Sequence, residues 1–205
     1  MLEEKREKFK IISEKVGQIF SKFGPSPNQY TLISLLFVVF AFCSLVSANL
    51  ILPKHINYVL GLALIFFLLA AFLDFIDGAV AKFLKKETKK GAYLDTICDR
   101  YVEGIILLGF LFLPLADFLL PAKIWIFLAF FGSLMTTYSK AAAKEKELIQ
   151  IELKRGLFGR GERVILIILA MLLGILNFSW IIYPIIILAI LSNITALQRI
   201  HWVFK

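Results

Sequence analysis

The chain has 205 residues, of which 60% are hydrophobic and 19% are charged, and its 23 Lys and Arg against 15 Asp and Glu give a net charge of +8. A soluble domain is usually about 45–50% apolar. The composition therefore argues against a soluble enzyme and against a disordered tail. Two cysteines are too few for a disulfide scaffold. These numbers favour an integral membrane protein.

The first 22 residues differ from the rest of the chain, because they alternate in charge and lack the apolar core of a signal peptide. Apolar residues recur in this segment at helical spacing, opposite Lys and Glu: Phe9, Ile12, Val16, Ile19 and Phe20. The pattern predicts that residues 1–22 form an amphipathic juxtamembrane helix on the inner membrane surface. A solvated tail is the alternative.

Charge-free runs, together with a helical pattern in residues 91–114 that carries four charged residues, predict that residues 23–205 form an all-α domain of six transmembrane helices. The last run extends from Val164 to Gln198, which is too long for one crossing, and it breaks around residues 177–180. The predicted spans are 28–50, 56–82, 91–114, 121–143, 160–177 and 180–200.

Orientation follows from the distribution of Lys and Arg between the two sides of the membrane. One side holds the N-terminal segment, the connections 82–90 and 140–163, and the C-terminal residues 199–205. The other side holds only Lys54 and Lys123. We therefore expect a multi-pass protein of the cell membrane with both termini in the cytoplasm. The positive charge reflects this inner surface and a phosphate pocket, not a nucleic-acid partner.

Four aspartates lie inside the second and third predicted spans, where an ionisable group costs roughly 2.5–3.5 kcal/mol on insertion scales and indicates a functional site. Asp74 and Asp77 are three residues apart, and Asp95 and Asp99 are four apart, so each pair shares a helix face. A short basic loop joins the two spans, which lets both pairs meet at the cytoplasmic end. Clustered carboxylates need cations, and oxygen ligands favour Mg²⁺ or Mn²⁺. A channel or transporter is the alternative, although the outer halves of these spans are apolar.

The aspartates belong to a longer pattern with small residues at fixed positions: Asp74-x2-Asp77-Gly78-x2-Ala81-Lys82-x8-Gly91-x3-Asp95-x3-Asp99. Small residues let a phosphorylated ligand approach the backbone, and close helix packing is the other explanation for them. The whole string resembles the signature of the CDP-alcohol phosphatidyltransferases. The family usually has Arg where this chain has Lys82, which keeps the charge but not the bidentate fork.

The resemblance implies a six-helix membrane enzyme whose active site faces the cytoplasm. Such enzymes transfer the phosphatidyl group of a CDP-lipid to an alcohol and release CMP. The resemblance further implies two divalent ions held by Asp74, Asp77, Asp95 and Asp99, with Asp99 as the general base. An ion pair with Arg100 is the alternative role of Asp99. Family members are homodimers, which we carry over as an expectation.

The resemblance also assigns residues to the CDP-lipid: Asn28, Gln29, Tyr30, Thr31, Asp74, Gly78, Lys82 and Thr88. The first four belong to a Pro-Asn-x-x-Thr element at the start of span one, where capping by Asn28 and Thr31 is the competing explanation. The composition, rich in Lys, Ile and Phe, favours a thermophilic source and hence CDP-archaeol as donor. CDP-diacylglycerol stays open.

Four cations lie near the ends of the last three spans at one membrane level: Lys140, Arg160, Arg163 and Arg199. Together they suit an acceptor that carries phosphate. Snorkelling of their side chains toward the lipid headgroups is the alternative.

Three strings around these cations resemble elements of the phosphatidylinositol-phosphate and archaetidylinositol-phosphate synthases: Tyr138-Ser139-Lys140-Ala141, Arg160-Gly161-Glu162-Arg163 and Gln198-Arg199. This resemblance implies inositol phosphate as the acceptor. The chain departs from those enzymes at Ala142, Lys144 and Gly161, where Arg, Glu and Pro are usual. Glycerol 3-phosphate remains the alternative acceptor, whereas serine, a zwitterion, suits four cations less well.

Overall fold

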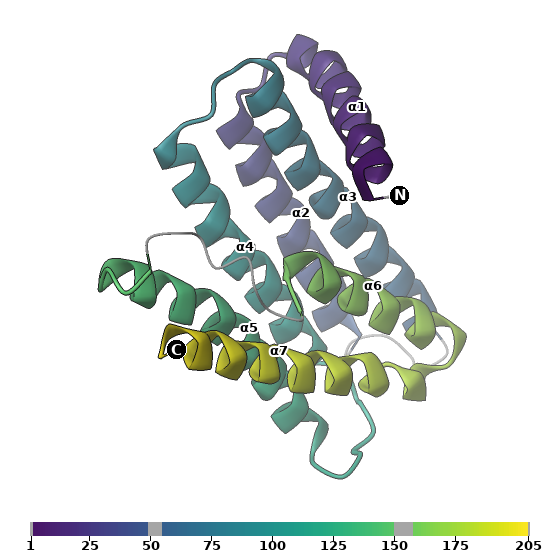
Figure 1. The fold of residues 1–205 in the computed structure, drawn as a ribbon. Helices are drawn as coiled ribbons and strands as arrows, with labels where there is room; N and C mark the ends of the chain where they lie inside the picture. The colour runs from purple at the N-terminus through teal and green to yellow at the C-terminus, as the bar shows by residue number, and fades with distance from the viewer. Residues whose placement is uncertain (1, 49–54, 150–157, 205) are drawn as a thin grey trace. The chain divides into compact units, whose positions relative to one another are not determined.

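The computed structural model describes residues 2–48, 55–149 and 158–204, and the regular structure in these ranges is helical apart from an isolated bridge between Phe118 and Leu120. Figure 1 shows the helices in chain order. They are α1 (Leu2–Phe20), η1 (Ser21–Phe23), α2 (Pro27–Ser47), α3 (Ile56–Phe83), α4 (Lys89–Phe110), α5 (Ala122–Glu145), α6 (Arg160–Leu176), η3 (Phe178–Trp180) and α7 (Ile182–Val203).

Each of the six predicted spans coincides with one helix, from α2 to α7, with ends that differ by a few residues. Residues 49–50 of the first span and Lys54 lie outside the described residues. Within the described ranges, three helical segments are long and apolar enough to cross a membrane: Pro27–Ser47, Ile56–Phe83 and Phe178–Val203. The chain is therefore a helical membrane protein. Helices α4, α5 and α6 are not among these three segments; α6 has 17 residues, and α4 and α5 are less apolar.

The start of α2 follows from local sequence. Gly24 adopts a φ of 95°, which ends the preceding 3₁₀ turn, and Pro27 occupies the first helical position, where its missing N–H costs nothing. The side chain of Gln29 accepts a hydrogen bond of 2.7 Å from the backbone N–H of Ser26, which is the reciprocal half of a capping box. Asn28 and Thr31 lie inside the helix and do not cap it, so the capping explanation for them does not hold.

The described chain divides into two compact units, Met1–Phe40 with Ile65–Val102 and Ala41–Leu64 with Glu103–Lys205. Helices α2, α3 and α4 each contribute one segment to either unit. We call them the first and the second unit and describe each by itself.

The first unit packs the C-terminal end of α1 against α3 (Figure 1). Gly17 makes this approach possible, because a Cβ at this position would lie 2.5 Å from the carbonyl oxygen of Ala79. Val16 and Phe20 pack against a buried cluster of Tyr30, Ile76 and Val80. The helix predicted for residues 1–22 is thus present, but its apolar face is divided. Ile12 and Ile19 are each 54% exposed, and the side chain of Phe9 lies outside the described residues.

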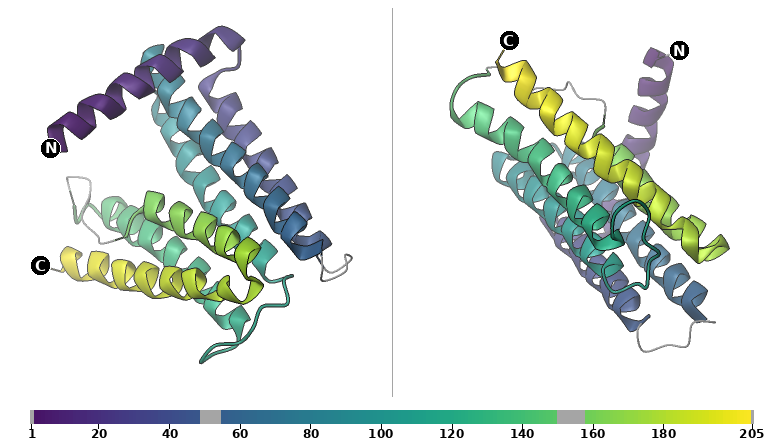
Figure 2. Two further views of the ribbon diagram at one scale, coloured as in Figure 1. Left: turned by 90° about the vertical axis from the view of Figure 1, so that its right-hand side faces the viewer. Right: turned by 90° about the horizontal axis from the view of Figure 1, so that it is seen from below.

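In the second unit, α5 and α7 run side by side in the same direction (Figure 2). Small residues permit the contact, since a Cβ at Gly132 would lie 2.8 Å from the backbone nitrogen of Asn193. The Asn193 amide donates to the carbonyl oxygens of Leu128 and Ala189, at 2.9 and 2.8 Å. Ser133 and Ser192 place their hydroxyl oxygens 3.5 Å apart at the same interface. The pairing fixes the register in which polar residues of α5 and α7 meet.

Candidate active site

The first unit brings aspartates of α3 and α4 together. Asp74, Asp95 and Asp99 each offer one carboxylate oxygen, and these oxygens lie within 4.8 Å of one another. Asp99 is buried, while Asp74 and Asp95 are half-buried. Three carboxylates at this separation repel one another unless a cation lies between them, and an all-oxygen donor set suits Mg²⁺ or Mn²⁺. The donor set therefore fits the divalent metal that the sequence predicts.

Asp77, the fourth predicted ligand, is only 7% exposed and lies outside that group of three. Its carboxylate accepts a hydrogen bond of 2.6 Å from the hydroxyl of Thr31 on α2. The same hydroxyl lies 3.2 Å from the carbonyl oxygen of Pro27. Thr31 therefore holds one oxygen of Asp77, and Asp77 also lines the neighbouring cavity.

A cavity of about 470 Å³ opens beside the aspartates in the first unit. Its size is typical of small-molecule sites. The residues that line it come from the start of α2, the end of α3 and the start of α4: Ser26, Pro27, Asn28, Thr31, Asp77, Gly78, Ala81, Lys82, Lys86, Glu87, Thr88, Gly91, Ala92 and Asp95. Three acidic residues and two lysines thus line the same hollow. We call it the donor cavity.

Two glycines shape the wall of the donor cavity. A Cβ at Gly78 would meet nothing within 4 Å, so a side chain there would enter open space. A Cβ at Gly91 would lie 3.2 Å from both the Asn28 side-chain oxygen and the Thr88 hydroxyl. The Thr88 hydroxyl also accepts a hydrogen bond of 3.0 Å from the Gly91 N–H, which caps the start of α4.

Most of the residues that the resemblance assigns to the CDP-lipid line the donor cavity, but three do not belong to its lining. Gln29 caps α2, as described above. Tyr30 is 5% exposed, and its hydroxyl donates a hydrogen bond of 2.9 Å to the carbonyl oxygen of Phe20. Asp74 belongs to the group of three carboxylates. Gln29 and Tyr30 therefore stabilise the junction of α1 and α2, and their direct contact with a donor stays a prediction.

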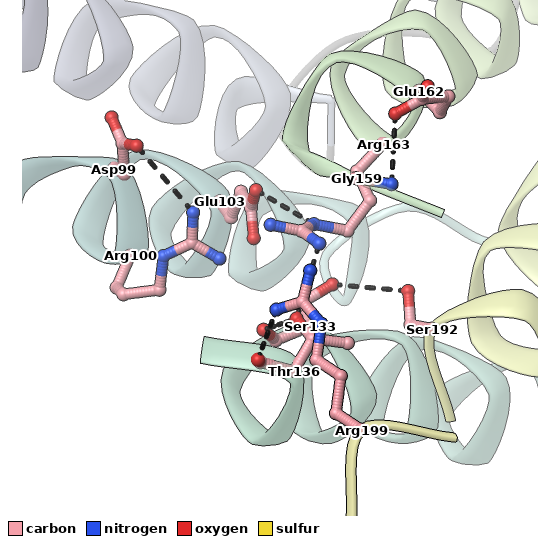
Figure 3. Close-up of polar contacts among 10 residues, drawn as sticks. All are labelled: Asp99, Arg100, Glu103, Ser133, Thr136, Gly159, Glu162, Arg163, Ser192 and Arg199. Carbon is pink, nitrogen blue, oxygen red and sulfur yellow. Dashed lines mark hydrogen bonds and ion pairs between the residues drawn. The ribbon is translucent and has the colours of Figure 1, made fainter. Parts of the chain in front are cut away.

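The alternative partner for Asp99 is present as well. A guanidinium nitrogen of Arg100 lies 3.7 Å from an Asp99 oxygen, and both side chains are largely buried (Figure 3). A pair at this distance is long for a charge-assisted hydrogen bond. Asp99 therefore belongs to the group of three carboxylates and also lies beside the Arg100 cation. The structure is compatible with both its predicted role as metal ligand and its alternative role in an ion pair.

The second unit contains its own buried polar cluster, shown in Figure 3. The Arg163 side chain of α6 donates from Nε to Glu103 of α4, at 3.0 Å, and from Nη1 to the Thr136 hydroxyl of α5, at 3.2 Å. Arg199 of α7 donates to the carbonyl oxygen of Thr136. Arg163 and Glu103 are 3% exposed as side chains. The Arg163 side chain is therefore buried in the protein and does not extend toward the lipid headgroups.

Thr136 is the point on α5 where arginines of α6 and α7 meet. Lys140 lies one turn beyond it on the same face of α5, and Arg160 opens α6 one turn before Arg163. The N–H of Gly159 donates to Glu162 at 2.9 Å, which caps α6 and orients its first turn. The four cations predicted to hold phosphate thus occupy neighbouring turns of α5, α6 and α7 in the second unit.

Two residues of this cluster have no predicted role. Glu103 stands out in the sequence only as a fourth ionisable group in the third span, and Thr136 carries no signal at all. The cost of a charge inside a span could have identified Glu103 as the partner of a cation. Nothing in a single sequence shows which of the many Ser and Thr residues faces an arginine.

Three comparisons with known proteins bear on this geometry. The sequence pattern of the CDP-alcohol phosphatidyltransferase family matches residues 25–195. The archaetidylinositol phosphate synthase of Pyrococcus horikoshii is 32% identical over 201 residues, which are 98% of this chain and 95% of the relative. The archaetidylinositol phosphate synthase of Methanothermobacter thermautotrophicus is 36% identical over 141 residues, 67% of this chain and 68% of the relative.

Solved structures show the same fold. The crystal structure of Mycobacterium tuberculosis phosphatidylinositol phosphate synthase with CDP-DAG bound has a TM-score of 0.73 at 22% identity, over 95% of this chain and 94% of that one. A second structure of that protein, in complex with manganese and citrate, also has a TM-score of 0.73 at 22% identity, over 94% of this chain and 89% of that one. At this identity the likeness shows the fold alone.

Proposed function

The chain belongs to the CDP-alcohol phosphatidyltransferase family, and from this premise we propose that it transfers the phosphatidyl-type group of a CDP-lipid to inositol phosphate and releases CMP. One observation carries the proposal. Three carboxylates within 4.8 Å of one another adjoin a cavity lined by lysines, and Asp95 belongs to both. That arrangement suits a diphosphate bound with divalent metal.

In this proposal Asp74, Asp77, Asp95 and Asp99 hold divalent ions, either Mg²⁺ or Mn²⁺. When bound, such ions neutralise a diphosphate and the leaving phosphate of CMP. The manganese complex of the M. tuberculosis protein supports the metal class. The number of two ions is carried over from the family resemblance, with Asp77 as the fourth ligand.

The donor cavity holds the CDP part of the donor, and its residues have separate tasks. Lys82 balances the negative diphosphate, and Gly78 leaves the room that a phosphate needs beside the aspartates. Asn28 offers an amide on the same wall, while Thr31 acts through Asp77. Thr88 caps the start of α4, the helix that carries Asp95 and Asp99 on one face.

Asp99 takes the proton of the attacking hydroxyl. The hydroxyl oxygen of the acceptor forms a bond to the phosphorus that carries the lipid, and the bond between that phosphorus and the bridging oxygen breaks. The electron pair of the broken bond leaves with CMP, and the proton goes to the Asp99 carboxylate. Burial of Asp99 excludes water, which would otherwise compete with the acceptor as nucleophile.

Lys140, Arg160, Arg163 and Arg199 bind the phosphate of the acceptor. Two arginines in the first turn of α6 oppose the helix dipole, which already makes that end positive. A bound anion would neutralise both the charge of the arginines and the positive end of the helix dipole, since a helix N-terminus itself favours phosphate. The relatives from P. horikoshii and M. thermautotrophicus are named archaetidylinositol phosphate synthases, which supports this acceptor.

For the topology, we propose that all six helices α2–α7 cross the membrane, that residues 1–22 lie on its inner surface, and that both termini and the active site face the cytoplasm. Asp74 follows the start of α3 by 18 residues, or about 27 Å of helix. This length places it near the edge of a hydrocarbon core of about 30 Å. The homodimer stays a prediction, which cross-linking in native membranes checks.

The test is CMP release by the purified protein in vesicles with Mg²⁺ or Mn²⁺. CDP-archaeol and CDP-diacylglycerol serve as donors, and inositol phosphate, glycerol 3-phosphate, serine and inositol as acceptors. We expect release with inositol phosphate above all others, and a loss of at least about 100-fold for Asp99→Asn. Asp117→Asn is the matched control, because that side chain only accepts from the N–H of Ala122 at the start of α5. If none of the four acceptors gives CMP release above background, the proposal is overturned. If only glycerol 3-phosphate gives release, the acceptor is glycerol 3-phosphate and not inositol phosphate.

A further inference from the structure

We propose that Glu103 and Thr136 are positioning residues for the acceptor, because they fix the arginines of α6 and α7 in the orientation that receives its phosphate. The inference rests on the proposed function and adds two residues to it. Neither residue touches the reacting atoms. Both act through Arg163 and Arg199.

The contact between Glu103 and Arg163 is a buried ion pair. Arg163 Nε lies 3.0 Å from a Glu103 oxygen, and both side chains are 3% exposed. Because burial removes the hydration of both charges, removal of Glu103 would leave Arg163 as an uncompensated buried charge. Glu103 therefore keeps Arg163 in a place where a lone arginine would turn toward water. The pair joins α4 to α6 through two residues that are 60 positions apart in the chain.

Thr136 fixes the direction of the same guanidinium from the other side. Its hydroxyl donates to the carbonyl oxygen of Ser133, at 2.7 Å, and accepts from Arg163 Nη1, at 3.2 Å. A hydroxyl has one proton, so the bond to Ser133 leaves its lone pairs facing the arginine. The Thr136 carbonyl oxygen accepts from Arg199. One residue of α5 thus aligns arginines from two other helices.

The consequence is a guanidinium held at two of its five N–H groups. Nε is committed to Glu103 and one N–H of Nη1 to Thr136, which leaves both N–H groups of Nη2 and the second N–H of Nη1 for a ligand. A guanidinium plane that is fixed by two hydrogen bonds presents its remaining donors in a set direction, as binding of phosphate requires. A lysine cannot replace such a fork. The cluster is therefore an arginine clamp of set geometry, and the ion pair with Glu103 compensates the buried charge of Arg163 between substrates.

A purely structural role predicts something different from a positioning role. If the pair only held α4 and α6 together, its loss would lower thermal stability and reduce activity with all substrates alike. If it positions the clamp, its loss raises KM for inositol phosphate and leaves KM for the CDP-lipid nearly unchanged. The two readouts come from the same assay.

The first experiment measures both KM values and the thermal unfolding of the full-length protein in vesicles. We expect Glu103→Gln to raise KM for inositol phosphate at least about tenfold, with less than a twofold change for the CDP-lipid. Thr136→Val should raise the same KM by a smaller factor. Thr136→Ser keeps the hydroxyl and should have the wild-type KM for inositol phosphate. Ser192→Ala is the matched control, since it removes a buried hydroxyl from the α5–α7 interface without touching an arginine.

The second experiment exchanges the two charges in Glu103→Arg/Arg163→Glu. The exchange restores an ion pair at the same site, so thermal unfolding should return most of the way to the wild-type temperature. KM for inositol phosphate should stay raised at least about tenfold, because the cation has moved from α6 to α4. Recovery of both quantities, or equal shifts of both KM values in Glu103→Gln, would overturn the inference.

Direct binding separates this inference from the proposed function. Isothermal titration of inositol phosphate should show weaker binding to Glu103→Gln than to the wild type, whether or not CMP is released. If the wild type neither binds inositol phosphate nor releases CMP with it, the proposed function fails. If the wild type does both and the variants match it, only the positioning role fails.

Discussion

Gly78 shows how a single residue can decide whether a ligand fits. It follows Asp77 directly on α3, it lines the donor cavity, and a Cβ there would meet nothing within 4 Å. A large side chain at this position would therefore cost little in the folded protein, and it would fill space that the proposed donor needs. Helix propensity even favours replacement of this glycine, by up to about 1 kcal/mol for Ala.

We predict that Gly78→Leu raises KM for the CDP-lipid by at least about tenfold while the thermal unfolding temperature stays level or rises. Gly61→Leu is the matched control, because Gly61 lies on the same helix, also has nothing within 4 Å of a Cβ, and is not part of the cavity lining. Steady-state kinetics with varied donor measure the difference. Equal effects of the two substitutions would contradict a donor site beside Asp77.

Contacts of single side chains are also the features for which the prediction from sequence differs most from the structure. The spacing of the four aspartates predicts that they share helix faces, and three of them do meet within 4.8 Å. The spacing could not predict that Thr31 would hold Asp77, because that bond joins residues 46 positions apart. Such contacts depend on the rotation of each helix about its axis, and a hydrophobic span leaves that rotation undetermined.

At the scale of elements, α1 has an apolar face that is divided between two environments and a separate polar side. Its periodicity predicts one apolar face for the membrane, yet Val16 and Phe20 use part of that face to pack against the protein. Ile12 and Ile19 form the rest and are exposed. On another side, Lys10, Ser13, Glu14, Lys15 and Gln18 line a basic cavity shared with the end of α3. A helix with this division can contact protein, headgroups and acyl chains at once.

We predict that a spin label at Ile19 of the vesicle-bound protein is accessible to oxygen, which dissolves in acyl chains, and shielded from a water-soluble nickel reagent. A label at Gln18, which lines the basic cavity, should show the reverse. Both measurements use Ile19→Cys and Gln18→Cys in a background where Cys43 and Cys98 are Ser. Equal nickel accessibility at the two positions would favour a solvated tail over an interfacial helix.

Over the whole molecule, the positions of the helices were predictable because charged residues and helix breakers mark where a span can end. The helices α2–α7 coincide with the six predicted spans to within a few residues. Composition also predicts membrane character, which the three long apolar helices confirm. Which cation pairs with Glu103 could not be predicted, since Arg163 could equally have served the surface, the substrate or another span.

The metal site links local chemistry to the stability of the whole chain. Asp74, Asp95 and Asp99 repel one another when no cation is bound, and a cation that binds only the folded protein stabilises it according to its concentration over Kd. At 100 times Kd the gain is about 2.7 kcal/mol. For a chain of this length such a gain corresponds to a rise of roughly 5–10 °C in Tm.

We therefore predict that Mn²⁺ or Mg²⁺ at saturating concentration raises the Tm of the protein by roughly 5–10 °C over a chelated sample of equal ionic strength. Asp95→Asn should abolish most of this rise and should raise the Tm of the chelated protein, because it removes one of three mutually repelling charges. Asp117→Asn should behave like the wild type, since its carboxylate lies outside the group. Differential scanning fluorimetry gives the shift, and titration calorimetry gives the number of ions. One ion per chain would restrict metal binding to the group of three, and a rise that survives in Asp95→Asn would place the ion elsewhere.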